Sequence, residues 1–71
     1  MERFIPQNSI ISYFQYVLNK DGFIESEIIK FNDGTLEIKY IYIQNEINEI
    51  TYFLKYNDGE TLQLHKKFNL L

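Results

Sequence analysis

Residues 29–38 read IKFNDGTLEI, and residues 54–64 read LKYNDGETLQL. In both stretches the tripeptide Asn-Asp-Gly separates two short segments in which apolar and polar residues alternate. Such alternation is typical of a strand with one buried face, and an Asp-Gly turn between alternating segments is a strong local signal for a β-hairpin. The near-repeat therefore predicts two antiparallel hairpins.

The second copy contains one additional residue, Glu60, which changes the predicted loop. In the first hairpin a two-residue loop at 33–34 places apolar residues opposite one another. The expected pairs there are Phe31–Leu36, Ile29–Ile38 and Lys30–Glu37. The second hairpin needs a three-residue loop at 57–59 to place Leu54 opposite Leu62, because a one-residue slip moves every side chain to the other face.

The segment that precedes the hairpins has a different apolar period. Its apolar residues recur at helical spacing at Ile10, Ile11, Phe14, Val17 and Leu18. Asn8 and Ser9 are suited to cap the first turn, and Gly22 is suited to end the helix. The pattern predicts an amphipathic helix over about residues 9–20, after which the period becomes two.

These elements predict an α+β fold in a single domain of residues 1–71. The N-terminal helix is expected to pack on a four-stranded antiparallel β-meander that contains the two Asp-Gly hairpins. The polar segment 44–49 is expected to form the turn between the hairpins, and a helical stripe through residues 43–54 is the alternative. A helix followed by short strands is also similar to Sm-like and other SH3-like small barrels. Their loop motifs are absent here, and such a barrel is the alternative fold.

A meander of this kind separates the side chains onto two faces. The face expected beneath the helix is almost entirely apolar and carries Phe23, Ile29, Phe31, Leu36, Ile38, Tyr40, Tyr42, Ile50, Tyr52, Leu54, Tyr56, Leu62 and Leu64. Phe14, Leu18, Ile38 and Leu54 are expected to be nearly fully buried. The opposite face is mostly polar but also carries Ile24, Ile28, Ile41, Ile43 and Phe53, more large apolar residues than one-sided sheets usually expose. Phe53, Ile28, Ile41 and Ile43 are therefore the predicted partner-binding residues, unless the sheet curls to bury them.

Composition excludes several classes of protein. The chain has no cysteine and one histidine, which removes disulfides, thiolate metal sites and multi-histidine metal sites. Its net charge of −3 argues against non-specific binding to nucleic acid. No apolar run reaches the roughly 20 residues of a membrane span, and no signal peptide is evident, so a cytoplasmic location is expected.

Few residues are candidates for catalysis or ligand binding. His65 has no serine or cysteine nucleophile at a recognisable spacing, so the chain is not expected to be an enzyme or to need a cofactor. Glu25 and Glu27 lie two apart and are expected on the same face as Tyr40 and Tyr42. These four residues are the candidates for a small-ligand site.

Three functions of different class follow. The first is a small non-catalytic protein-binding module that binds another protein or a second copy of itself through a sheet face. The abundance of Ile, Asn, Lys and Tyr indicates AT-rich coding, which favours an inhibitor or accessory factor of a phage or mobile element. The alternatives are a domain that stacks single-stranded nucleic acid on its aromatic strands and a small-ligand-binding domain.

Overall fold

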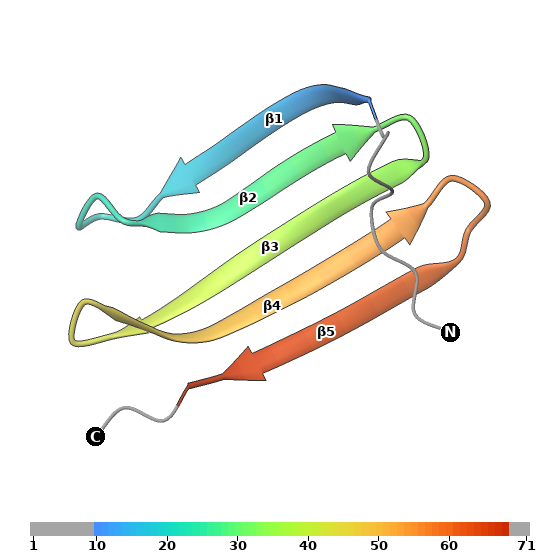
Figure 1. Cartoon of the computed structure of the whole chain (residues 1–71). Coiled ribbons are helices and arrows are strands. Elements are labelled where there is room, and N and C mark those ends of the chain that lie inside the picture. The colour runs from blue at the N-terminus through green and yellow to red at the C-terminus, as the bar shows by residue number, and fades with distance from the viewer. Residues whose placement is uncertain (1–9, 69–71) are drawn as a thin grey trace.

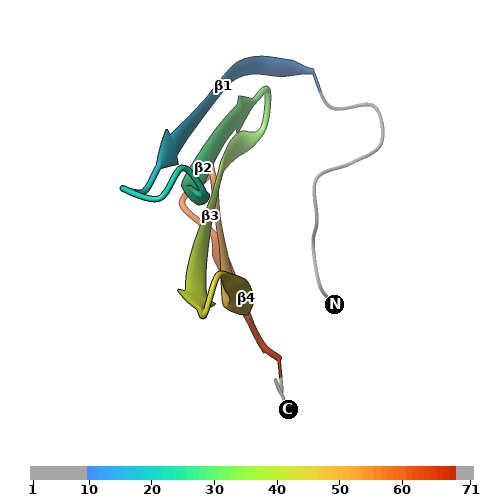
Figure 2. The ribbon, with the colours of Figure 1, turned by 90° about the vertical axis from the view of Figure 1, so that its left-hand side faces the viewer.

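The computed structural model describes residues 10–68, which form one antiparallel sheet of five strands (Figure 1). The strands are β1 (Ile11–Leu18), β2 (Ile24–Phe31), β3 (Gly34–Ile43), β4 (Glu46–Tyr56) and β5 (Thr61–Lys67). Their order in the sheet is their order in the chain, so each strand pairs with the next one as a meander. Seen from the side, the strands form a single twisted layer (Figure 2).

The helix expected over residues 9–20 is wrong. Residue 9 lies outside the described residues, and Ile11–Leu18 form β1, which pairs along its length with β2. The segment reads ISYFQYVL, in which β-branched and aromatic residues predominate, and these favour strands over helices. Because six of its eight residues are large and apolar, helical spacing could be found in it without a helix being encoded.

Residues 10–68 form five strands and no helix, which corrects the prediction of an α+β fold with a four-stranded sheet. The sheet is also open, which corrects the small-barrel alternative. β1 and β5 are the two edges of the sheet and make no contact with each other in the described part of the chain. Within residues 10–68 there is no helix long and apolar enough to cross a membrane.

The first Asn-Asp-Gly turn is displaced by one residue from the predicted position. Phe31 pairs with Gly34 and Ile29 with Leu36, so the two-residue loop is Asn32–Asp33. A Cβ at Gly34 would lie 2.3 Å from the Lys55 carbonyl oxygen, so this glycine permits close approach of β3 and β4 and does not serve the turn. Because the loop moves by one residue, the partner of each β2 residue moves by two, as for Phe31, which pairs with Gly34 and not with Leu36. Every side chain therefore remains on its expected face.

The second turn has the predicted loop. Leu54 pairs with Leu62 and Tyr52 with Leu64, as the additional Glu60 required. The Tyr56 amide donates to the Glu60 carbonyl at 2.8 Å, which closes the three-residue loop 57–59. Gly59 has a φ of 95°, the left-handed conformation that this loop type requires of its last residue.

The polar segment 44–49 contains a turn and no helix, so the helical alternative is excluded. The loop is Gln44–Asn45, and its residues have φ values of 53° and 66°, as in a type I′ hairpin turn. β4 begins directly after the turn, and its register against β3 shifts between Ile47 and Glu49. Asn48, the residue skipped by this shift, is buried.

The core lies on one face of the sheet, here called the core face, and the opposite face is called the outer face. Phe31, Leu54 and Tyr56 form a buried cluster near the Asn32–Asp33 and 57–59 turns, with Leu36 and Leu62 packed against it. The predicted burial of Ile38 and Leu54 is confirmed. The predicted burial of Phe14 and Leu18 is wrong, because both lie on the edge strand β1 and are 52% and 50% exposed.

A matched pair of leucine substitutions tests this core. Leu54→Ala should lower the free energy of unfolding by about 2–5 kcal/mol, because Leu54 is 4% exposed and its removal leaves a cavity. Leu18→Ala should cost much less. Denaturant unfolding followed by circular dichroism measures both, and equal losses would contradict the position of the core.

The close approach at Gly34 gives a second test. A Cβ there would lie 2.9 Å from the Tyr56 Cα as well as against the Lys55 carbonyl, so β3 and β4 must move apart to accept a methyl group. Gly34→Ala should therefore destabilise the protein by roughly 1–3 kcal/mol. Unchanged stability in chemical denaturation would mean that the strands are not held this closely.

Candidate protein-interaction surface

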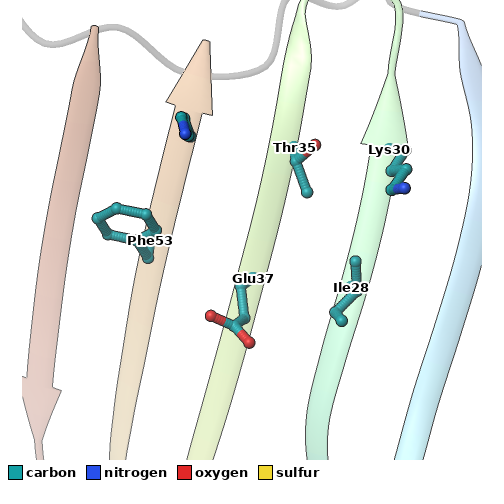
Figure 3. Close-up of a pocket in the computed structure, with 6 residues that line it drawn as sticks. Ile28, Lys30, Thr35, Glu37 and Phe53 are labelled. Carbon is teal, nitrogen blue, oxygen red and sulfur yellow. The ribbon is translucent and has the colours of Figure 1, made fainter. Parts of the chain in front are cut away.

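Two of the four predicted partner-binding residues lie together on the outer face. Ile28 and Phe53 flank Glu37 in one row across β2, β3 and β4. With three further residues they line a shallow depression of about 380 Å³ (Figure 3), and those three are Lys30, Thr35 and Lys55. Phe53 is 37% exposed at its rim.

The other two predicted residues, Ile41 and Ile43, lie on the same face but farther along β3. Both are about half exposed, and they are opposite Glu49 and Glu46. A polar row lies between them and Phe53, made of Ser26, Lys39, Thr51 and His65. The four residues thus form two small apolar groups and no continuous patch.

The predicted ligand cluster is assembled in part, on the core face. The Tyr40 hydroxyl donates a hydrogen bond to the Glu27 carboxylate, and the Tyr42 hydroxyl donates to the Ile24 carbonyl at 2.6 Å. The rings of Phe23 and Tyr42 lie 5.3 Å apart. Glu25 is exposed and is the residue skipped by the register shift between β1 and β2, so it does not join Glu27.

The Tyr40 hydroxyl is held in its protonated form. Burial, and then the hydrogen bond to Glu27, raise the pKa of Tyr40 well above its ordinary value. A phenol in this state donates to a carboxylate and does not act as a base. The arrangement connects β2 to β3, and both tyrosine donors already have acceptors within the sheet.

The basic segment of β5 is divided between the two faces. His65 lies on the outer face, where its Nε2 is 2.9 Å from Glu49 Oε1. Lys66 lies on the core face, with its Nζ 6.0 Å from the centre of the Tyr52 ring. Strand alternation therefore prevents the His-Lys-Lys sequence from forming one basic patch. Within residues 10–68 no three His, Asp or Glu side chains lie close enough to hold a metal ion.

The most exposed apolar surface is β1, which sequence reasoning had assigned to the core. All eight residues of the strand are exposed. The large apolar side chains exposed on β1 and on the residue before it are Ile10, Ile11, Tyr13, Phe14, Tyr16, Val17 and Leu18. One signal of this surface was present in the sequence: residues 4–19, between Arg3 and Lys20, include no charged residue.

The two edges of the sheet differ in a way that matters for binding. β5 carries His65, Lys66 and Lys67, and lysine on an edge strand is a common protection against pairing with other chains. β1 carries no charged residue. The side of β1 that faces away from β2 presents backbone donors and acceptors, and apolar side chains flank it on both faces of the sheet. β1 is therefore the edge that is better suited to pair with another strand.

Comparison of the chain with protein-family models, with curated proteins and with solved structures finds no match.

The Tyr40–Glu27 contact predicts a dependence of stability on pH. Because the folded-state pKa of Tyr40 is raised, its contribution is fully present below about pH 10, the ordinary tyrosine value, and is lost as the pH rises through the folded-state pKa. Tyr40→Phe should cost about 1 kcal/mol near neutral pH. Its difference from wild type should shrink in alkaline solution, and Glu27→Gln should weaken the same dependence. Melting curves at increasing pH measure this, and a constant difference would contradict it.

Proposed function

We propose that this chain is a non-catalytic protein-binding module that contacts its partner through β1. The observation that carries the proposal is an edge strand whose eight residues are all exposed and uncharged. An added strand would pair with the side of β1 that faces away from β2, where no other strand of residues 10–68 lies, and its side chains would cover apolar residues on both faces of the sheet. An inhibitor or accessory factor would act in this way by occupying the strand edge of its target.

The composition of β1 supports recognition of protein. Tyr13, Phe14 and Tyr16 supply large and rigid contact surfaces with few rotatable bonds. Tyrosine and phenylalanine are enriched at protein interfaces, and charged residues are depleted from interface centres. β1 has both properties, whereas the apolar groups of the outer face are interrupted by lysine, glutamate and histidine.

The alternatives have less support. Binding of single-stranded nucleic acid needs a basic groove beside its aromatic platforms, and here the basic segment of β5 is divided between two faces, with His65 against Glu49. A small-ligand site at Tyr40 and Tyr42 would have to compete for hydroxyls that already donate within the sheet.

Site-specific photo-cross-linking in cells tests the proposal. A benzophenone amino acid at Phe14 on β1 should give one adduct of defined mass, because a partner strand would lie against that side chain. The same group at Gln63, an exposed position on β5, should not. Val17→Lys should abolish the Phe14 adduct by placing a charge in the interface, and Thr61→Lys should leave it unchanged. The absence of any adduct at Phe14, or equal adducts at both edges, would contradict the proposal.

A further inference from the structure

We propose that the strand that pairs with β1 is β1 of a second copy of this chain, in antiparallel register about Gln15. The inference rests on the proposed function of β1 as a strand-addition surface and identifies the partner. Two five-stranded sheets would thereby join into one continuous sheet.

The regular part of β1 determines this register. The pairing of β1 with β2 shifts between Ile11 and Tyr13 and again between Val17 and Leu18. Between these shifts, residues 13–17 pair one by one with β2 and present an unbroken outer edge. Gln15 is the centre of this segment. A two-fold axis through Gln15, perpendicular to the sheet, therefore pairs the whole regular segment with itself.

The side chains brought together by this register are complementary. Paired residues of antiparallel strands point to the same face. Phe14 of each copy would meet Tyr16 of the other on the core face, and Tyr13 would meet Val17 on the outer face. Aromatic–aromatic and aromatic–β-branched pairs are among the favourable cross-strand combinations.

The charges beside β1 also permit this pairing. Lys30 is the β2 neighbour of Tyr13, and Glu27 is the β2 neighbour of Tyr16. In the joined sheet, the cross-strand row of Lys30 and Tyr13 continues into Val17 and Ser26 of the second copy. The row of Glu27 and Tyr16 continues into Phe14 and Ile29 of the second copy. No row brings like charges together, although each chain has a net charge of −3.

The pairing would also cover apolar side chains that β1 leaves exposed. Tyr13, Phe14, Tyr16 and Val17 are 45%, 52%, 53% and 42% exposed. In the dimer each of them would lie beside one of the same four residues of the second copy, which removes apolar surface from water on both faces of the sheet.

Sedimentation of the purified chain tests the dimer. Wild type should reach twice the 8.6 kDa of one chain as its concentration rises. Val17→Lys should weaken association at least tenfold, because the two-fold axis places a lysine in the interface twice, while its circular dichroism spectrum stays that of the wild type. Thr61→Lys on β5 is the matched control and should dimerise as wild type does.

Single cysteines test the register, since the chain has no cysteine of its own. In Gln15→Cys the two thiols would lie opposite each other, so air oxidation should link the copies rapidly. In Tyr13→Cys each thiol would face Val17 of the other copy, and linkage should be at least tenfold slower. Both positions are exposed and on the same face.

Three results of the sedimentation and cysteine experiments would overturn the inference. A wild-type chain that stays monomeric at all concentrations would exclude the second copy, and association unaffected by Val17→Lys would exclude β1 as its site. Oxidation of Tyr13→Cys as fast as Gln15→Cys would exclude the register. The photo-cross-link distinguishes the two proposals: a Phe14 adduct with another protein would refute this inference and keep the proposed function, and no adduct would refute both.

Discussion

The close approach of β3 and β4 at Gly34 determines the register of the sheet. Gly34 lies between Phe31 of β2 and Tyr56 of β4, and Tyr56 is the most buried side chain described, at 1% exposure. Hydrogen bonds between the turns strengthen this end of the sheet, since Asn57 donates from its amide to the Asp33 carbonyl at 2.9 Å and from its side chain to the Asn32 carbonyl at 3.2 Å. Because antiparallel strands alternate strictly, this one alignment assigns most side chains to a face.

Much of the sheet could be predicted from the sequence because alternation and loop length constrain each other. Glu60 alone was sufficient to exclude a two-residue loop like that of the first hairpin, since that loop would have placed Leu54 and Leu62 on opposite faces. The first turn was misplaced because Gly34 was interpreted as a turn residue. Its real constraint is the closeness of Lys55, a residue of another hairpin, and no local pattern reveals such a contact.

The candidate sites were predicted unevenly for the same reason. The contact of Tyr40 with Glu27 follows from strand pairing and could be anticipated. The separation of Glu25 from Glu27 depends on a register shift that the sequence does not signal. β1 was missed because its apolar residues fit a helical stripe, and only its pairing with β2 shows that Phe14 and Leu18 are exposed.

The run of apolar residues that made β1 hard to predict also supports its proposed function in binding another strand. Edge strands that do not pair with other chains are usually protected by lysine or other charged residues, whereas strands buried on both faces read as nearly continuous apolar runs. By this criterion β5, with Lys66 and Lys67, has the sequence of a protected edge, and β1 has the sequence of a strand buried on both faces. Among residues 10–68, β1 has a neighbour on one side only, β2. An edge strand with the composition of a strand buried on both faces is what the sheet would contain if the second neighbour of β1 came from another molecule.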